Sequence, residues 1–354
     1  MRVVVAMSGG VDSSVAASLL AEAGHDVIGL SMQLYDQRES PDAFGSCCSI
    51  DDLHDARRVA AKIGIPHYLV NFEARFQETV VKNFVSEYAA GRTPIPCVHC
   101  NADLKFATLA DKAAGFDAAA VATGHYARVV FDEDRRRYRL QRGVDAGKDQ
   151  SYFLFSLTQD QLGQAMFPVG HLTKPEVRAH AERLGLPVAN KPDSHEICFV
   201  PDGDAGGFVE RKLEIEDVSG EIVDSGGRVL GRHRGIHRLT VGQRRGLGLA
   251  EAVPMYVLRL EPKDARVVVG PRDELGRRDL TASQVNWIAG EPPAEPARVT
   301  ARIRHRHQDA PAVVTPDGDT RASLRFDEPQ LAVTPGQAVV FYDGADVVGG
   351  GWID

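Results

Sequence analysis

The spacing of apolar residues changes within the first 25 residues of the chain. Val3–Val5 is a continuous run of β-branched residues, which is typical of a buried strand. From Val15 to Ala23 the apolar residues instead recur as they do on one face of a helix. The sequence AMSGGVDS, Ala6–Ser13, lies between the two runs and contains adjacent glycines. The pattern therefore predicts a strand, a tight glycine loop and a helix.

Strand and helix patterns continue to alternate through the first half of the chain. Predicted strands are Val27–Leu34, His67–Asn71 and Ala118–Thr123, and predicted helices are Asp55–Ile63, Phe76–Ala89, Lys105–Ala114 and Leu172–Leu184. Phe131–Arg142 reads as a charged β-hairpin with its turn at 132–135, and a helical region is expected from Tyr152. This alternation predicts an α/β fold built on a doubly wound parallel sheet.

Two segments interrupt the alternation. Arg92–Asn101, with the sequence RTPIPCVHCN, contains two prolines that we expect to hold it extended and outside regular structure. Pro187–Asp204 is loop-like. From about Gly220 onward the pattern is all β. It predicts a hairpin at Gly226–Gly231, and the expected strands are Tyr256–Leu260, Arg266–Gly270, Val299–Arg304 and Gln337–Tyr342.

The predicted elements divide the 354 residues into three domains. Residues 1–205 form the α/β domain, residues 206–275 a small β-rich central domain, and residues 276–354 a C-terminal β-barrel. No apolar run approaches the roughly 18 residues that span a bilayer, so we expect no membrane association. Because no signal-peptide pattern is present and the five cysteines are too unevenly spaced for a disulfide scaffold, we expect a cytoplasmic protein.

The net charge of −8 argues against indiscriminate binding to nucleic acids. It does not exclude a local basic surface, because Arg135–Arg137, Arg232–Arg245 and Arg298–His307 are rich in cations. Within the second run, Arg234–Arg245 would suit an RNA backbone, and the alternative is a charged surface loop.

The glycine loop has the chemistry of a phosphate-binding site. Such a loop directs successive backbone N–H groups into one hollow at the positive end of a helix. Gly9 and Gly10 permit close approach of phosphate oxygens, and nearby serines, Ser8, Ser13 and Ser14, supply hydroxyl donors. Asp12 does not favour a bare phosphate, so it suggests a metal ion or an attacking group nearby. The loop lacks the GxxxxGK[ST] pattern of a Walker A motif.

The cysteines fall into two kinds. Cys47 and Cys48 are adjacent, so their side chains diverge and we expect them to be structural. Cys97 and Cys100 form a CxxC arrangement, and Cys198 lies far along the chain in SHEICF. A structural zinc site is a weak alternative, because no second pair of cysteines follows.

The hexapeptide SGGVDS resembles the pyrophosphatase loop (PP-loop) of enzymes that split ATP into AMP and pyrophosphate. PCVHCN and SHEICF, together with GHYAR (Gly124–Arg128), KDQSYF and GQRRGLG, resemble the tRNA-specific 2-thiouridylase family (MnmA/TrmU) from the N-terminus to Gly336–Gly344. The resemblance implies ATP-dependent 2-thiolation of the wobble uridine of tRNA, with release of AMP and pyrophosphate. It also implies tRNA as a partner and a sulfur-carrier protein or cysteine desulfurase relay as the sulfur source.

The resemblance implies roles for individual residues. ATP, with Mg²⁺, would contact Ala6, Met7, Ser8, Gly9, Gly10, Val11, Asp12, Ser13, Met32 and Gly124. Contacts with tRNA would come from His125, which is expected near the target base, and from Lys148, Asp149, Gln150, Arg304, His305 and Gln337. Spacing alone favours a core role for Met32, and each predicted tRNA contact, taken by itself, is better explained as a solvated surface residue.

The resemblance places a persulfide on Cys198 and makes Cys100 the partner thiol, which releases sulfide or forms a disulfide with Cys198. Both need thiolate character, and His99 and His195 are their neighbours in sequence. The family often has Asp where this chain has Cys97. Cys97, Cys100 and Cys198 together would also suit three irons of a [4Fe–4S] cluster, so the cluster route stays open beside the persulfide route.

Two other functions fit parts of the sequence. Another PP-loop ligase, such as an amidotransferase, would be expected to have a glutaminase domain or partner, and the chain begins directly at the loop. A tRNA-binding protein with an inactive ATP site is the second alternative. The loop residues Ser8, Gly9, Gly10, Asp12 and Ser13 are all present, as are Cys100 and Cys198, which argues against loss of activity.

Overall fold

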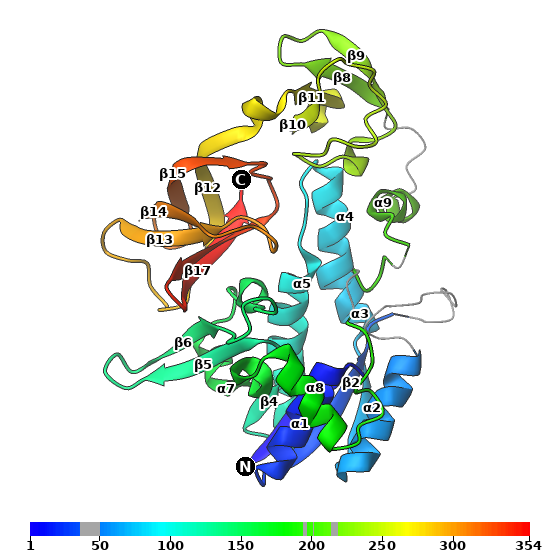
Figure 1. Cartoon of the computed structure of the whole chain (residues 1–354), viewed down its shortest axis with the longest axis vertical. Helices are drawn as coiled ribbons and strands as arrows, with labels where there is room; N and C mark the ends of the chain where they lie inside the picture. The colour runs from blue at the N-terminus through cyan, green and yellow to red at the C-terminus, as the bar shows by residue number, and fades with distance from the viewer. Residues whose placement is uncertain (36–49, 194–196, 201, 214–218) are drawn as a thin grey trace.

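The computed structural model of the chain describes residues 1–35, 50–193, 197–200, 202–213 and 219–354. The described residues form three β-sheets (Figure 1). Cys47, Cys48 and His195 lie outside the described residues. None of the helices in the described ranges has the length and apolar character needed to cross a bilayer.

The first sheet is parallel throughout and has the strand order β3-β2-β1-β4-β7. Its strands are β1 (Arg2–Ala6), β2 (Asp26–Gln33), β3 (His67–Asn71), β4 (Ala120–Ala122) and β7 (Ala165–Met166). The order places β1 at the centre, with later strands added on both sides. The predicted doubly wound sheet is confirmed.

Helices cover both faces of this sheet because successive side chains of a strand point to opposite sides. Val3 and Val5 pack into a core with α1 (Val11–Glu22), α2 (Ile50–Ile63) and α8 (Lys174–Arg183). Val4 and Ala6 pack into a larger core on the other face. That face is covered by α3 (Glu73–Phe76), η2 (Gln77–Val81), α4 (Lys82–Ala89), α5 (Pro96–His99), η3 (Cys100–Thr108) and α6 (Leu109–Ala114).

The CxxC segment is helical, which corrects the prediction of an irregular segment over Arg92–Asn101. Cys97 lies in α5, and Cys100 begins the π-helical segment η3. Pro96 occupies the first position of α5, where the missing N–H of proline is not needed for an intrahelical hydrogen bond. The second proline therefore starts a helix, and only the residues before it are extended.

Shorter helical segments complete the part of the chain that precedes the second sheet. They are η4 (Ser151–Phe153), which is a single 3₁₀ turn where a helix from Tyr152 was predicted, α7 (Gln159–Gln164), η5 (Pro168–His171) and α9 (Ala205–Leu213). The second sheet has the order β10-β11-β8-β9 and its own small core. Its elements are β8 (Gly220–Asp224), β9 (Val229–His233), η6 (Ile236–Arg238), β10 (Tyr256–Glu261), η7 (Pro262–Asp264) and β11 (Arg266–Gly270).

The C-terminal part is a closed antiparallel β-barrel, as predicted. It follows η8 (Arg272–Leu275), and its six strands are β12 (Gly276–Trp287), β13 (Ala297–Arg302), β14 (Ala310–Pro316), β15 (Ala322–Leu331), β16 (Ala338–Asp343) and β17 (Asp346–Ile353). They pair in the order β12-β15-β14-β13-β16-β17, and pairing of β12 with β17 closes the barrel. Its interior is filled by side chains that include Trp287, Phe326 and Phe341.

A hairpin from the first half of the chain joins this barrel. The hairpin consists of β5 (Ala127–Asp132) and β6 (Arg137–Arg142), and its turn lies one residue later than predicted. Gln141 of β6 pairs with Asp346 of β17, and the Asp346 carboxylate accepts hydrogen bonds from Arg139 and Gln141. The barrel is thereby fixed beside the parallel sheet (Figure 1).

Candidate functional site

The glycine loop joins β1 to α1 at the carboxyl end of the central strand. Gly9 has a φ of 76°, and a Cβ at this position would lie 2.1 Å from the backbone oxygen of Asp52. Only glycine fits there. The hydroxyl groups of Ser13 and Ser14 donate to the backbone oxygen of Gly10, and the Ser8 backbone N–H donates to Ser13 Oγ. The loop is therefore built by its own serines as well as its glycines.

Two other predicted nucleotide contacts lie at neighbouring strand ends. A Cβ at Gly124 would lie 2.6 Å from the backbone nitrogen of Ser13, so the segment after β4 passes directly against the first turn of α1. Met32 is buried, and its side chain packs in the larger core of the sheet. Its side chain therefore has the core role that spacing suggested, and only its backbone lies at the end of β2.

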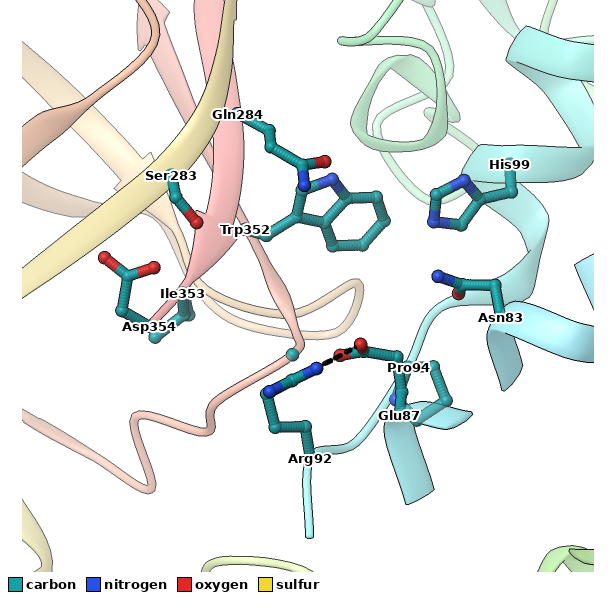
Figure 2. Close-up of a pocket in the computed structure, with 11 residues that line it drawn as sticks. Asn83, Glu87, Arg92, Pro94, His99, Ser283, Gln284, Trp352, Ile353 and Asp354 are labelled. Carbon is teal, nitrogen blue, oxygen red and sulfur yellow. Dashed lines mark hydrogen bonds and ion pairs between the residues drawn. The ribbon is translucent and has the colours of Figure 1, made fainter. Parts of the chain in front are cut away.

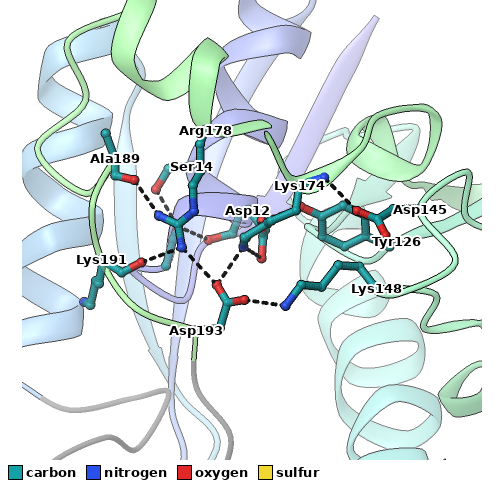
Figure 3. Close-up of polar contacts among 12 residues, drawn as sticks. Asp12, Ser14, Tyr126, Asp145, Lys148, Lys174, Arg178, Ala189, Lys191 and Asp193 are labelled. Carbon is teal, nitrogen blue, oxygen red and sulfur yellow. Dashed lines mark hydrogen bonds and ion pairs between the residues drawn. The ribbon is translucent and has the colours of Figure 1, made fainter. Parts of the chain in front are cut away.

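Asp12 is held by two groups from distant parts of the chain (Figure 3). Lys174 Nζ lies 2.7 and 2.9 Å from the two carboxylate oxygens of Asp12, and the Tyr126 hydroxyl donates to one of them over 2.8 Å. The sequence suggested a metal ion or an attacking group beside Asp12, which stays a prediction, and the group that faces the carboxylate within the protein is the Lys174 ammonium. Burial, followed by the charge of Asp12, raises the pKa of the Tyr126 hydroxyl.

Asp193 extends this network. Its carboxylate lies 2.8 Å from Lys174 Nζ and 2.7 Å from Lys148 Nζ, with the guanidinium of Arg178 3.5 Å away. Partial burial disfavours the charged form of Asp193, but hydrogen bonds from Lys148 and Lys174 outweigh it and lower the pKa of Asp193 to about 2. The carboxylate is therefore ionised at neutral pH.

A second lysine braces the other side of the loop. Lys191 Nζ donates to the backbone oxygen of Gly9 over 3.1 Å and pairs with the carboxylates of Asp52 and Asp55 in α2. Lys174, Lys191 and Asp193 were not singled out in the sequence. Asp12 is 162 residues from Lys174, and Asp52 and Asp55 are 139 and 136 residues from Lys191, so neither spacing nor neighbours in sequence mark these contacts.

The thiols that were predicted to exchange sulfur share one hydrophobic core. Cys100 and Cys198 are half-buried and both pack against the larger core of the sheet, whereas Cys97 is exposed. Phe199, which follows Cys198, contacts the rings of Phe76 and Phe84 at centroid distances of 5.4 and 5.0 Å. The Cys198 segment therefore lies against α3 and α4.

The three cysteines do not assemble into a metal site. Within the part of the chain that the structure describes, no group of three or more His, Cys, Asp or Glu side chains is arranged to hold a metal ion. Cys97, Cys100 and Cys198 all belong to that part. A [4Fe–4S] cluster on these three residues therefore stays a prediction.

The CxxC helix lies beside the barrel (Figure 2). The Thr93 backbone N–H donates to the backbone oxygen of Pro335, and Gln337 Nε2 donates to the backbone oxygen of Thr93. His99 stacks on Trp352 of β17. A cavity of about 420 Å³ lies at this junction, and its walls include Asn83, Glu87, Arg92, Gln284 and Asp354.

Most of the predicted tRNA contacts are engaged within the protein. Asp149 is buried, accepts hydrogen bonds from Ser151 and from the Gly143 N–H, and pairs with Arg142 and Arg302. The Lys148 ammonium pairs with the Asp193 carboxylate. The remaining contacts are between Gln150 and the Tyr126 backbone, Arg304 and the Leu331 oxygen, His305 and the Phe153 ring, and Gln337 and Thr93.

His125, predicted near the target base, is buried beneath the site. Its Nδ1 lies 2.7 Å from the Thr123 hydroxyl, and its ring contacts Phe106 and Phe167. Burial, assisted by the charge of Lys105, holds the pKa of His125 well below its ordinary value. The imidazole is therefore neutral at pH 7.

The chain was compared with known proteins. Family models match residues 1–202 (tRNA methyl transferase HUP domain), 206–271 (tRNA methyl transferase PRC-barrel domain) and 277–353 (aminomethyltransferase beta-barrel domain). A solved 4-thiouridine synthetase–RNA complex with bound ATP aligns with a TM-score of only 0.36 and 14% identity, over 60% of this chain and 50% of that chain.

Curated relatives are much more similar and match the whole chain. The tRNA-specific 2-thiouridylase MnmA of Geotalea uraniireducens is 55% identical over 100% of this chain and 95% of its own length. The protein of the same name from Solibacter usitatus is 53% identical over 99% of both chains. With this identity sustained across the parallel sheet, the second sheet and the barrel, the chain belongs to the tRNA-specific 2-thiouridylase (MnmA) family.

Proposed function

We propose that this protein catalyses ATP-dependent 2-thiolation of the wobble uridine of tRNA. The observation that carries the proposal is full-length membership of the 2-thiouridylase family. A tight loop before α1, in which only glycine fits at position 9, supports it. The amidotransferase alternative has no comparable support, because the curated relatives from Geotalea uraniireducens and Solibacter usitatus, which match almost their full length, are named 2-thiouridylases.

The first step would activate the uracil. The uracil oxygen at carbon 2 attacks the α-phosphorus of ATP, and the bond from that phosphorus to the bridging oxygen breaks, so that pyrophosphate leaves with the electron pair. The backbone N–H groups of the loop and of the first turn of α1 would hold the phosphates. Mg²⁺ would accompany ATP, and the Asp12 carboxylate is an oxygen ligand of the kind that Mg²⁺ takes. The product is an adenylated base with a good leaving group.

The second step would replace AMP by sulfur. The terminal sulfur of a persulfide on Cys198 attacks carbon 2, and AMP leaves with its oxygen. Cys100 thiolate attacks the inner sulfur, so the S–S bond of the persulfide breaks and a Cys100–Cys198 disulfide forms. The two cysteines supply the electrons that convert sulfane sulfur to the thiocarbonyl, and a cellular dithiol reductant must restore them. Packing of both thiols against one core supports this pairing.

The remaining parts would serve the tRNA and the sulfur supply. We assign residues 1–205 to ATP and sulfur chemistry, residues 206–275 to a linking domain and residues 276–354 to tRNA contact. Of the predicted tRNA contacts, Gln337 and His305 lie where the barrel meets the first domain, against Thr93 and Phe153. A sulfur-carrier protein or a cysteine desulfurase would load Cys198.

Single cysteine variants test the sulfur step. Purified wild type and Cys97→Ser, Cys100→Ser and Cys198→Ser variants receive tRNA, ATP and a persulfide donor, and AMP and 2-thiouridine are both measured. Cys100→Ser and Cys198→Ser should form AMP but no 2-thiouridine, whereas Cys97→Ser, the matched control in the same motif, should retain both. Thiolation that depends on Cys97 and on bound iron in anaerobic preparations would contradict the persulfide route and favour a cluster.

A further inference from the structure

Lys174 occupies an unusual position beside the glycine loop. Its side chain is only 10% exposed, and its ammonium lies within 2.9 Å of two carboxylates, Asp12 and Asp193. The ammonium also lies 5.9 Å from the centroid of the Tyr126 ring. A lysine so enclosed has exchanged its hydration shell for protein partners, which is costly unless the partners are well placed.

Stability alone is a poor reason for this arrangement. Desolvation offsets most of the attraction in a buried ion pair, and apolar residues of similar volume often serve a fold as well. The pair instead joins two helix starts, because Asp12 lies in the first turn of α1 and Lys174 is the first residue of α8. The positive N-terminal end of α1 and the lysine at the start of α8 are thus directed to the same glycine loop.

Charged groups of both signs surround this lysine. The two carboxylates Asp12 and Asp193 face three cations, Lys148, Lys174 and Arg178. Lys191 adds a cation on the opposite side of the loop, where it contacts the Gly9 backbone and is paired with α2. The Asp145 carboxylate accepts a hydrogen bond from the Lys174 backbone N–H, so three carboxylates balance these three cations, and Asp52 and Asp55 balance Lys191. An anion therefore gains the Lys174 ammonium by taking the place of a carboxylate, Asp12 or Asp193.

We propose that Lys174 is a catalytic residue that binds the β- and γ-phosphates of ATP and stabilises pyrophosphate as it leaves. The inference rests on the proposed function, since it assumes that ATP is cleaved at this loop. Asp12 and Asp193 hold the ammonium in place before the nucleotide binds. When ATP enters, Lys174 exchanges carboxylate oxygens for phosphate oxygens, which are acceptors of the same kind.

The proposed role of Lys174 follows from where negative charge develops during the reaction. As the bond between the α-phosphorus and the bridging oxygen breaks, its electron pair passes to that oxygen, and negative charge grows on pyrophosphate. The Lys174 ammonium donates hydrogen bonds to this charge and keeps its protons. A fixed cation at the leaving group stabilises the transition state more than the ground state.

Variants at position 174 test this role. Lys174→Met keeps the length of the side chain without its charge, and Lys174→Arg keeps a charge. The matched control is Arg183→Met in the same helix, where Arg183 pairs with Glu22 at the surface. We expect Lys174→Met to lower AMP formation by about 100-fold and to weaken ATP binding by about tenfold, with partial recovery in Lys174→Arg and no change in the control.

Comparison of ATP with AMP separates phosphate binding from a purely structural role. AMP lacks the β- and γ-phosphates, so Lys174→Met should change its affinity less than about threefold. If the lysine only fastens α8 to α1, the variant should lose affinity for ATP and AMP equally, and that result would overturn the inference. Undiminished AMP formation in Lys174→Met would overturn it too. Failure of wild type to form AMP with tRNA would instead count against the proposed function itself.

A measurement on the wild-type protein covers the case in which Lys174→Met does not fold. An ATP derivative with an acyl group on its terminal phosphate transfers that group to a lysine amine near the γ-phosphate. Mass spectrometry should find the acyl group on Lys174, and excess ATP should prevent the labelling. Acylation that misses Lys174 while ATP-protected labelling occurs on lysines elsewhere would contradict the inference.

Discussion

The indole ring of Trp352 lies parallel to the imidazole ring of His99, with the ring centroids 4.9 Å apart and an angle of 5° between the planes (Figure 2). His99 stands between Cys97 and Cys100 in the CxxC segment, and Trp352 is in the last strand of the barrel. The barrel therefore contacts the helix that carries the predicted partner thiol. Hydrogen bonds between Thr93 and residues 335–337 fix the chain just before that helix.

Replacement of Trp352 should impair sulfur transfer more than adenylation. Trp352→Ala removes the stack, so the start of η3 and the Cys100 thiol lose a fixed position relative to Cys198. We expect 2-thiouridine formation to fall about tenfold, because small misplacements of reacting groups are costly, while AMP formation stays within about twofold of wild type. Trp352→Phe, which keeps an aromatic face, should fall much less.

The rate of iodoacetamide labelling at Cys100, followed by mass spectrometry, gives a second readout for these variants. Loss of the stack should raise the labelling rate in Trp352→Ala and leave it near wild type in Trp352→Phe. Equal thiolation and equal labelling in wild type and Trp352→Ala would show that the stack does not position the thiol.

Gly124→Ala should disturb the nucleotide site by a steric route. The added Cβ would lie 2.6 Å from Ser13 N and 2.7 Å from the carbonyl carbon of Asp12, so the start of α1 must shift. We expect a loss of about 1–3 kcal/mol in the free energy of unfolding and a marked loss of ATP affinity. Urea denaturation and equilibrium ATP binding measure the two effects.

The control for Gly124→Ala is Gly226→Ala in the turn between β8 and β9. There the nearest atom to the added Cβ is Asp224 Oδ1 at 3.4 Å, and φ is not in the left-handed region. This variant should match wild type in both measurements. If Gly124→Ala also matched wild type, the close approach of the β4 segment to α1 would not matter for ATP binding.

The fold was accessible to sequence reasoning because its signals are local. Val3–Val5, the glycine loop and the helix after it form one continuous pattern, and pleating then sends Val4 and Val5 to opposite cores. The CxxC helix was missed for a local reason as well. Pro94 and Pro96 were both interpreted as helix breakers, although Pro96 suits the first position of a helix.

The ion network at the site was beyond sequence reasoning for a different reason. Lys174 and Asp12 are 162 residues apart, and nothing in the sequence around either residue indicates the other. For Asp149, the sequence suggests an exposed residue, but the structure buries it. In KDQS it reads as one polar residue among several exposed ones, yet its side chain is 2% exposed and paired with arginines from β6 and β13. Burial of a carboxylate depends on partners that only the folded chain supplies.

Asp149→Asn should therefore act through stability. The variant leaves the buried guanidinium groups of Arg142 and Arg302 with less compensating charge, and removal of one partner from a buried pair costs about 3 kcal/mol or more. Urea denaturation should show this loss. The protein that remains folded should bind tRNA with nearly normal affinity, because the carboxylate is enclosed.

The comparison variant is Asp327→Asn, whose carboxylate pairs with Arg298 at the surface. Its unfolding midpoint should stay close to that of wild type, because exposed pairs contribute little. Unchanged stability together with a large loss of tRNA affinity in Asp149→Asn would contradict the structural role and restore Asp149 as a direct tRNA contact.

The pairing of Asp193 with Lys148 and Lys174 gives a pH dependence of defined sign. Folding lowers the pKa of this carboxyl from its ordinary 3.8 to about 2, so the folded protein binds the proton less readily than the unfolded chain. The stabilisation is therefore fully present above about pH 4 and is lost as the pH falls from about 4 to about 2. The lowered pKa corresponds to a stabilisation of roughly 2 kcal/mol, because the Asp193 side chain is only 23% exposed and solvent screens its ion pairs in part.

Measurement of the free energy of unfolding of wild type and Asp193→Asn at several pH values tests this sign. Between pH 7 and about pH 4 the variant should be less stable by a constant amount, and below that range the difference should shrink, because wild type then also carries a neutral group at this position. A difference that grows on acidification, or one already absent at about pH 5, would mean that the two lysines do not hold Asp193 in its charged form in solution.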